Sequence, residues 1–409
     1  MPKELVADSV PHNAKSVRPA AREPYVLQRD VLAAASPSLV SQWQRFHTEH
    51  SADDPMRDPE WLRGYFEGQI NNLSFYSLMH GGEVCGLVPF LRRDWPLLLQ
   101  FGAWSVADLP LTRMRLLGTG LNFPDDEAAY DLLFSELAKS GSGFDAVYLE
   151  GVPIDSFLWR YLHDSRLIRR SFLSYSPSPP SPRPVLRLEG SYEQYLGKFN
   201  SKHRNTIARK IKKLRDGALG EMRLVRYEAP EEVDTFLDQA VEISKKTYQW
   251  ALHGRGLSMT SLLRDRLAFA AQRGWMRSYL LFCGDEARAF LLGFQYNGRF
   301  LLHETGFDPE LAKHSVGTVL QMLTVEDLFN CKRPHIFDLE DYGAYKEVLA
   351  TESYDQGKLF LFRPSLYARF ARAGHRACDG ANRAASTVLD KLNLKTKIKQ
   401  RVRGWSASR

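Results

Sequence analysis

The chain has 409 residues and a formal net charge of +7, from 55 lysines and arginines against 48 aspartates and glutamates. All of this excess lies in residues 391–409, which hold seven basic residues and no acid, so the rest of the chain is electrically balanced. A neutral chain with a basic tail argues against a general nucleic-acid-binding protein. Hydrophobic residues at 44% and aromatic residues at 12% exclude a disordered or fibrous chain, and the length predicts two or three domains.

The cysteines and the N-terminus exclude further classes. The four cysteines are far apart and form no CxxC or CxxxxH pair, so we expect small buried side chains, a reducing compartment and no metal site. Residues 1–24 lack the apolar core of a signal peptide, and no apolar run is long enough for a membrane helix. The sequence therefore predicts a soluble, cytoplasmic protein that begins with a disordered leader over residues 1–24.

In the first half, hydrophobic spacing predicts helices, a β-hairpin, a helix and a strand, in that order. The helices are predicted from about residue 37 and over 59–69. The hairpin is predicted with strands at 74–80 and 84–91 around Gly81-Gly82-Glu83. A further helix over 125–137 and a buried strand over 145–149 follow. Residues 174–184 then contain five prolines, which predicts an extended connector and excludes a helix or a central strand.

The second half repeats this order. Helices are predicted over 191–216, 230–246 and 260–273, and strands over 278–283, 289–296 and 299–306, the last two joined by an Asn297-Gly298 turn. A helix over 315–329 and a strand over 335–340 complete it. The repetition predicts two similar α/β domains side by side, at 25–175 and 185–365, rather than one large sheet. A connector at 176–184 joins them, and residues 366–409 form a basic helical tail.

The first segment that suggests chemistry is basic. Residues 201–216 place Ile207, Ile211 and Leu214 on one helical stripe and surround it with seven cations and one acid. Such a surface, which includes Lys202 and Arg204, is suited to a phosphate-bearing ligand. A solvated helix face explains the charge equally well.

Two further segments lie where strands end. A strand, a loop and then Ser315-Val316-Gly317-Thr318 at a helix start would direct backbone N–H groups at an anion, although an ordinary helix start explains the pattern as well. Residues 337–346, FDLEDYGAYK, place three acids, two tyrosines and a lysine after a strand. Polar groups at such strand ends often line sites, although turns are polar too.

Taken together, these segments resemble a known family. The run from the basic segment, through AFLLGFQYNGRFLLHETGFDPELAKHSVGTVL, to FDLEDYGAYKEVLA is similar to the GNAT-like acyltransferase domain of bacterial proteins associated with cellulose biosynthesis. That domain is related to the Fem-type peptidoglycan aminoacyl transferases. The resemblance covers about 180–365 and implies an α/β (α+β) fold of tandem GNAT-like domains. Each domain would be a mixed, mainly antiparallel sheet flanked by helices, and the first would be degenerate.

The resemblance also implies site residues. The acyl-CoA loop of the family falls on His314, Ser315, Gly317 and Thr318, where only the glycine matches the usual pattern and Val319 replaces a small residue. In the terminal motif Asp338, Tyr345 and Lys346 match the family, and Gly343 lies one place from the usual glycine.

The implied chemistry is direct transfer, in which an amine attacks a thioester or ester carbonyl while a base removes its proton. The base would lie on the strand before the loop, at His303 or Glu304, which should point to opposite faces. We expect Glu304, because burial raises the pKa of a carboxylate toward neutrality; the alternative is that it pairs with a lysine of the basic segment. Tyr345 is the candidate acid for the leaving group, or otherwise a core tyrosine.

The sequence therefore predicts N-acylation of an anionic small molecule or cell-envelope precursor, related to a polysaccharide or peptide. The donor would be acyl-CoA (acetyl-CoA or longer) or a carrier thioester, and no metal is expected. Lys202, Arg204, Asp338 and Lys346 would bind the substrate. One alternative is Fem-like transfer from aminoacyl-tRNA, the only nucleic acid that we expect as a partner. The other is a catalytically inactive binding protein of polysaccharide export.

The tail carries a last prediction. Its apolar residues share one face at helical spacing, so residues 391–409 are predicted to form a basic amphipathic helix: Leu394, Ile398, Val402 and Trp405. Such a helix either lies on an anionic membrane surface as a peripheral contact or is a solvated terminus.

Overall fold

The computed structural model describes residues 24–102, 104–139, 143–217, 219–247, 256–340 and 343–391. Residues 1–23 and 392–409 are outside this range, so the predicted leader and nearly all of the predicted tail helix lie outside the described residues.

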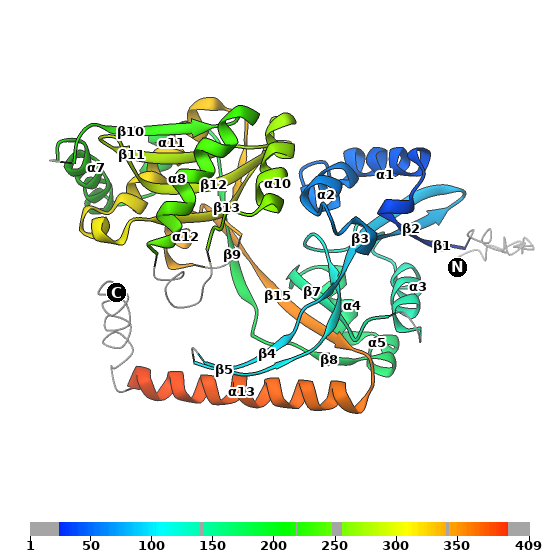
Figure 1. Cartoon of the computed structure of the whole chain (residues 1–409). Helices are drawn as coiled ribbons and strands as arrows, with labels where there is room; N and C mark the ends of the chain where they lie inside the picture. Colours follow the sequence, from blue (N-terminus) through cyan, green and yellow to red (C-terminus); the bar gives the residue numbers. More distant parts are fainter. Residues whose placement is uncertain are drawn as a thin grey trace, which may run out of the picture.

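Most strands belong to one large mixed sheet that runs through both halves of the chain (Figure 1). In spatial order its strands are β1 (Val26–Val31), β2 (Leu73–His80), β3 (Glu83–Asp94), β6 (Thr112–Leu116), β7 (Ala146–Pro153), β15 (Glu352–Phe362), β9 (Ser181–Arg187), β14 (Ile336–Asp338), β13 (Arg299–Phe307), β12 (Glu286–Tyr296), β11 (Ser278–Cys283) and β10 (Met222–Tyr227). The short strand β8 (Leu173–Tyr175) also pairs with β15. A separate hairpin is formed by β4 (Leu97–Phe101) and β5 (Trp104–Leu109).

Helices cover both faces of this sheet. The first half contributes α1 (Pro37–His50), α2 (Pro59–Tyr65), α3 (Glu127–Ala138), α4 (Phe157–Asp164) and α5 (Arg166–Ser171). The second half contributes α6 (Tyr192–Gly197), α7 (Ser201–Arg215), α8 (Val233–Lys245), α10 (Ser261–Gln272), α11 (Val316–Cys331) and α12 (Ala344–Leu349). In the second half α8 and α10 pack on one face of the sheet, and α6, α7 and α11 pack on the other. A long helix, α13 (Leu366–Lys391), ends the described chain.

The two halves repeat the same arrangement, which confirms the predicted fold class. In the first half β6 and β7 form a parallel pair with α3 between them in the chain, and in the second half β13 and β14 form a parallel pair with α11 between them. The other pairs in the sheet are antiparallel, as hairpin connections allow. Each half is therefore one α/β unit of the same kind.

The halves nevertheless share one sheet, so the prediction of two separate sheets is wrong. Strand β9, which follows the first half in the chain, pairs with β14 of the second half, and β15, which ends the second half, pairs with β7 of the first. Since β9 and β15 also pair with each other, the exchange joins the two sheets edge to edge. Periodicity reports elements but not which edges meet, which is why the sequence missed this exchange.

The proline-rich segment also differs from its prediction, because β9 is a central strand despite Pro182 and Pro184. Thr351 N donates a hydrogen bond to Val185 O at 2.9 Å, so Val185 faces β15. Neighbouring residues of a strand face opposite sides, so the two prolines direct their missing N–H groups toward β14. The β9–β14 register ends at Val185, and the prolines therefore remove no hydrogen bond from the sheet.

The long helix predicted over 191–216 is broken into α6 and α7. Asn200 adopts an extended conformation, and its side chain accepts a hydrogen bond from His203 N at 2.9 Å. Asn200 is therefore the N-cap of a new helix, which begins at Ser201 after α6 has ended at Gly197. Elsewhere the predicted helices and strands are found within a few residues of their positions, as in α1, α3, α10 and α11.

A buried carboxylate lies where the two sheets meet. Asp338, at the end of β14, is 2% exposed. Arg183 of β9 donates to both of its oxygens, at 3.1 and 2.8 Å, and Arg299 of β13 donates at 3.0 Å. Arg299 also pairs with Asp53 of the first half. Burial alone would raise the pKa of Asp338, but the two guanidinium groups outweigh it and hold that pKa below its usual value.

We expect Arg183→Ala to lower the free energy of unfolding by about 3–5 kcal/mol, because it leaves a buried carboxylate short of its main partner. Arg187→Ala is the matched control. Arg187 lies on β9 like Arg183, but its ion pair with Glu352 of β15 is exposed, so its loss should cost less than about 1 kcal/mol. Urea unfolding of both variants measures the difference; equal losses would show that the Arg183–Asp338 pair does not hold the sheets together.

Candidate functional site

The candidate site lies where β13 and β14 stop pairing. The parallel register joins only Arg299–Leu301 to Ile336–Asp338, although β13 continues to Phe307. Just beyond the paired part, β13 carries a β-bulge opposite Leu292 and Gly293, with His303 as the extra residue. A bulge next to the end of pairing bends the strand away from its neighbour and redirects side chains.

The bulge places His303 and Glu304 on the same side of β13. The His303 ring lies 5.7 Å from the ring of Phe294, which belongs to the core beneath α8 and α10. The Glu304 carboxylate lies within hydrogen-bonding reach of the backbone of Leu257, which belongs to the same core. The expectation that the two residues point to opposite faces is therefore wrong, because strict alternation fails at a bulge.

His303 is surrounded by aromatic rings and is kept neutral. Its ring is 6.3 Å from Tyr65 of the first half, in addition to Phe294. Burial, assisted by the charge of Arg266, lowers the pKa of His303 to about 4. A base this weak is poorly matched to proton abstraction near neutral pH.

Glu304 shows the opposite shift. Burial raises its pKa above the ordinary value of 4.5, while the backbone of Leu257 favours the ionised form. Within the described residues, which include all of α7, no lysine of that helix acts on Glu304, so the predicted alternative of an ion pair with the basic segment is not found. Of the two candidate bases on β13, Glu304 therefore has the higher pKa, since the pKa of His303 lies below 4.5 and that of Glu304 above it.

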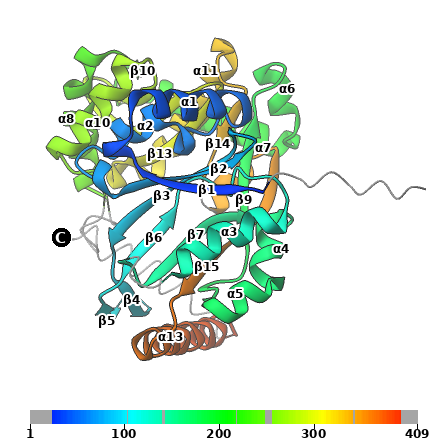
Figure 2. The ribbon, with the colours of Figure 1, turned by 90° about the vertical axis from the view of Figure 1, so that its right-hand side faces the viewer.

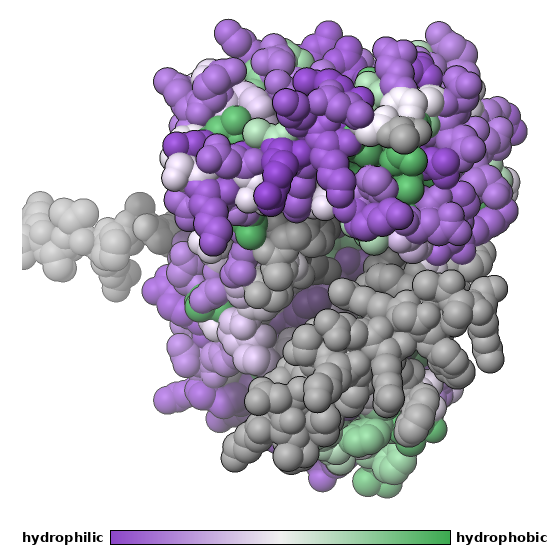
Figure 3. Space-filling view, turned by 90° about the vertical axis from the view of Figure 1, so that its left-hand side faces the viewer, coloured by the Kyte–Doolittle hydropathy of each residue, from purple (hydrophilic) through white to green (hydrophobic). Residues whose placement is uncertain are grey.

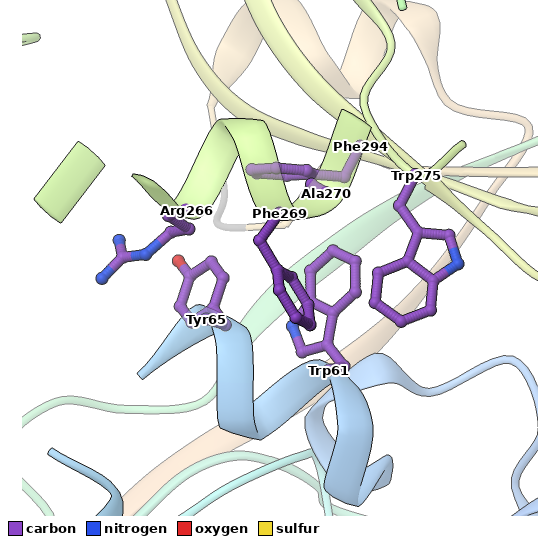
Figure 4. Close-up of a pocket in the computed structure, with 7 residues that line it drawn as sticks. All are labelled: Trp61, Tyr65, Arg266, Phe269, Ala270, Trp275 and Phe294. Atoms are coloured by element: carbon purple, nitrogen blue, oxygen red, sulfur yellow. The ribbon is translucent and has the colours of Figure 1, made fainter. Parts of the chain in front are cut away.

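An aromatic pocket between the halves borders this site (Figure 4). Helix α2 contributes Trp61 and Tyr65. Their rings face side chains of α10, of the segment that follows it and of β12: Arg266, Phe269, Ala270, Trp275 and Phe294. The Arg266 guanidinium carbon lies 4.2 Å from the centre of the Tyr65 ring. The first half thus supplies part of the wall beside His303. Sequence reasoning missed these residues because they come from elements distant in the chain.

The predicted cofactor loop forms the start of α11. A 3-10 turn, η5 (Pro309–His314), is followed by Ser315 in the left-handed conformation (φ 59°), and α11 begins at Val316 without a side-chain cap. Gly317 packs on Phe307, since a Cβ there would lie 2.8 Å from the Phe307 ring. Val319, which replaces the usual small residue, is 1% exposed and points into the core, so its bulk does not fill the loop.

His314 is the one predicted loop residue with a buried polar atom that lacks a partner in the structure. Its Nδ1 is buried and forms no hydrogen bond with any described residue. Thr318 is partly buried in the first turn of α11. His314 and Thr318 thus lie on either side of the uncapped first N–H groups of α11, a type of helix start that is suited to an anionic group.

The predicted substrate residues are spread over two places. Lys202 and Arg204 are exposed at the N-terminal end of α7, where Arg204 donates to the carbonyl of Phe199. Asp338 is buried and fully engaged by its arginines, so it orients them rather than facing solvent. Lys346 donates to Leu339 O at 2.6 Å. Tyr345 belongs to α12, but its side chain lies outside the described residues.

Near the start of α7, Lys198 is a group that sequence reasoning missed. Its Nζ donates to the carbonyls of Leu349 and Ala350 at 2.6 and 2.7 Å, and burial lowers its pKa to about 8. It lines a surface hollow together with residues at the start of α7 and at the end of α12: Phe199, Asn200, His203, Val348 and Ala350. No hydrophobic or charge pattern marks Lys198, because the carbonyls that accept its hydrogen bonds lie 151 and 152 residues later in the chain.

The sequence of residues 201–339 matches the family described as "Acetyltransferase (GNAT) domain". This segment holds the bulge, Glu304 and the start of α11, and the match supports an N-acyltransferase activity. No curated protein sequence matches the chain.

Solved structures show the same fold. The crystal structure of FemX matches with a TM-score of 0.56 at 11% identity, over 84% of this chain and 100% of that chain. Weaker matches include L-PGS from Bacillus licheniformis (TM-score 0.48, 12% identity, 85% and 97% covered) and a tandem GNAT protein from the clavulanic acid biosynthesis pathway (0.46, 14%, 83% and 99%). The FemX match therefore shows a similar fold over most of this chain.

The described residues contain no cluster of three or more histidine, cysteine or acidic side chains suited to a metal ion. None of the helices in the described part of the chain is long and apolar enough to cross a membrane.

We expect His303 to make the fold less stable in acid. Its folded pKa of about 4 lies below the ordinary 6.5, so between these values the unfolded chain binds a proton that the folded protein does not. Stability should therefore fall as pH drops from 6.5 toward 4, by up to about 1.4 kcal/mol per pH unit.

Urea unfolding across this pH range tests the assignment. His303→Phe, which keeps a ring between Tyr65 and Phe294, should flatten the slope, and the exposed His163→Phe should leave it as in the wild type. An unchanged slope in His303→Phe would show that the His303 ring is not kept neutral by the fold.

Proposed function

We propose that the protein transfers an acyl group from an acyl-CoA, or from a carrier thioester, to an amine of an anionic acceptor, with Glu304 as the base. The observation that carries the proposal is the placement of Glu304. A carboxylate with a raised pKa lies on the bulge of β13, where pairing with β14 ends and shortly before the chain enters α11.

The chemistry follows from that placement. The acceptor amine loses a proton to the Glu304 carboxylate as its lone pair attacks the thioester carbonyl, and the tetrahedral intermediate expels the thiolate as it re-forms the carbonyl. Backbone N–H groups at the open edge of β13 are the natural donors to the oxyanion. No covalent enzyme intermediate is required.

The second half, rather than the first, is suited to the cofactor phosphates. Helix α11 starts with no acidic residue in its first turn and with no side-chain cap on its N–H groups. The equivalent helix of the first half, α3, starts with Glu127 and is capped by the carboxylate of Asp126. Because an acidic helix start repels phosphate and a bare one attracts it, we place the donor at His314, Ser315, Gly317 and Thr318.

The acceptor would enter between the halves, and basic side chains there support an anionic one. Arg115 of β6 and Lys358 of β15 both pair with Glu150 of β7. Strand β15 pairs in turn with β9, which carries Arg183. The Nε of Arg115 is buried without a hydrogen bond to the described residues. These groups favour a phosphate- or carboxylate-bearing envelope precursor, such as an amino sugar or a peptide, while Lys202 and Arg204 remain a second, outer candidate surface.

The Fem-like fold makes aminoacyl-tRNA the rival donor, and a direct assay separates the two. Purified protein is incubated with an amino-sugar acceptor and either acetyl-CoA or aminoacyl-tRNA, and product formation is followed by mass spectrometry. Thioester-dependent product supports the proposal. Product from aminoacyl-tRNA alone would overturn it in favour of the rival.

Glu304→Gln should lower turnover by about 10²–10⁴-fold and leave acyl-CoA binding within about twofold, because it removes the base but keeps the shape of the side chain. Wild-type turnover should rise with pH through the pKa of Glu304, which lies above 4.5, since only the ionised form accepts the proton. Pre-steady-state assays and calorimetric titration measure the two effects. Unchanged turnover would exclude Glu304 as the base.

Thr318→Glu should weaken acyl-CoA binding by more than about tenfold without lowering the melting temperature. A carboxylate in the first turn of α11 favours the helix dipole but repels a pyrophosphate at the same N–H groups. Thr318→Gln is the neutral control of the same size and should bind nearly as the wild type does. Equal binding by Thr318→Glu and Thr318→Gln would place the phosphates elsewhere.

A further inference from the structure

Helix α13 packs on the protein through one well-defined face. Ala368 and Ala371 are buried there, and Gly374 contacts Leu99 of β4. Further along, Tyr175 of β8 donates to Asp379 at 2.7 Å and lies 2.7 Å from Nδ1 of His375, while the Asn382 side chain bridges Gly102 N and Gln100 O. These contacts fix the rotation of the helix about its axis from Ala368 to Asn382.

The opposite face of α13 is apolar and exposed. At helical spacing it presents a stripe whose large members are Leu366, 86% exposed, and Phe370, 62% exposed. The stripe continues through small side chains: Ala373, Ala377, Gly380, Ala381 and Ala384. The α13 ribbon forms the lower edge of the molecule in Figures 1 and 2 and has no other element beneath it.

Between Leu366 and Arg383, one flank of this stripe carries four arginines. Arg369, Arg376 and Arg383 recur every seven residues and are exposed, and Arg372 lies beside them. The one acid in residues 366–387, Asp379, faces inward to Tyr175. The exposed face therefore combines apolar side chains with three exposed arginines and the half-buried Arg372.

The hairpin packed on α13 carries the same kind of surface. The described chain has twelve large hydrophobic side chains that are exposed, and half of them lie in or beside the hairpin or on α13: Trp95, Phe101, Val106, Leu366, Tyr367 and Phe370. In Figure 3 hydrophobic residues gather at the lower edge of the molecule, where the hairpin and α13 lie in Figures 1 and 2. Surfaces of this composition mark interaction sites.

We propose that the outer face of α13 is a docking surface for an anionic phospholipid membrane, with Leu366 and Phe370 inserted among the headgroups. An apolar stripe flanked by arginines lies at a lipid–water interface, where the apolar side chains leave water and the cations meet phosphate. A protein partner would need acids to match the arginine row, and a nucleic acid would leave the apolar stripe in water. The surface of an anionic bilayer offers both an apolar interior for the stripe and phosphates for the arginines.

Co-sedimentation of the full chain with vesicles tests the proposal. Wild type should bind vesicles of phosphatidylglycerol and phosphatidylcholine, should bind pure phosphatidylcholine at least tenfold more weakly, and should release as salt is raised. Phe370→Asp should weaken binding at least tenfold while leaving every cation of residues 391–409 in place, and so should the triple variant R369Q, R376Q, R383Q.

The control is Leu262→Asp, which places the same charge on α10 at a side chain that is 39% exposed and far from α13 in sequence; it should bind as the wild type does. Melting temperatures of all variants should match, because the altered side chains are exposed. Undiminished binding by Phe370→Asp would assign any membrane contact to the tail and overturn the proposal. The proposal would also be overturned if the wild-type protein did not bind anionic vesicles, or if it bound tRNA through the arginines and not the vesicles.

Discussion

The structure depends on a single buried carboxylate, Asp338, at the seam between the two halves. Asp338 is 2% exposed, and the cationic partners that offset the cost of burying its charge come from β9 and β13. Arg299 extends the network to Asp53 of the first half. One polar group thus joins the strand that leaves the first half, the strand that carries the candidate base and a loop of the first half. These ion pairs add to the backbone pairing of β9 with β14 and β15 at the seam.

The same seam shapes the candidate site. Because β14 ends at Asp338, β13 continues without a partner on that side, and the bulge at His303 bends it just past the last paired residue. Tyr65 and Arg266 then meet across the boundary between the halves and keep His303 neutral, which leaves Glu304 as the titratable group suited to catalysis. The duplication therefore does more than repeat a fold, since the first half supplies part of the wall of the second half's site.

Much of the fold could be predicted from the sequence, because local patterns report local structure. The order of helices and strands, the repeat and the Gly317 helix start all follow from spacing and turn residues. The exchange of β9 and β15 could not be predicted, since strand pairing depends on contacts distant in sequence, and the prolines of β9 pointed away from it. The bulge could not be predicted either, because no residue of the segment 303–306 (HETG) indicates one. Arg183, Arg299, Tyr65 and Lys198 were missed because their partners come from other elements.

We propose that the acyl donor binds in the second half, at the start of α11, with its carbonyl beside Glu304. A crystal structure with a non-reactive CoA analogue tests this most directly. We expect the pyrophosphate on the N–H groups of residues 316–318 and the thiol end in the opening between β13 and β14. A pyrophosphate bound at the start of α3, or on α7 alone, would show that the donor does not bind at the start of α11.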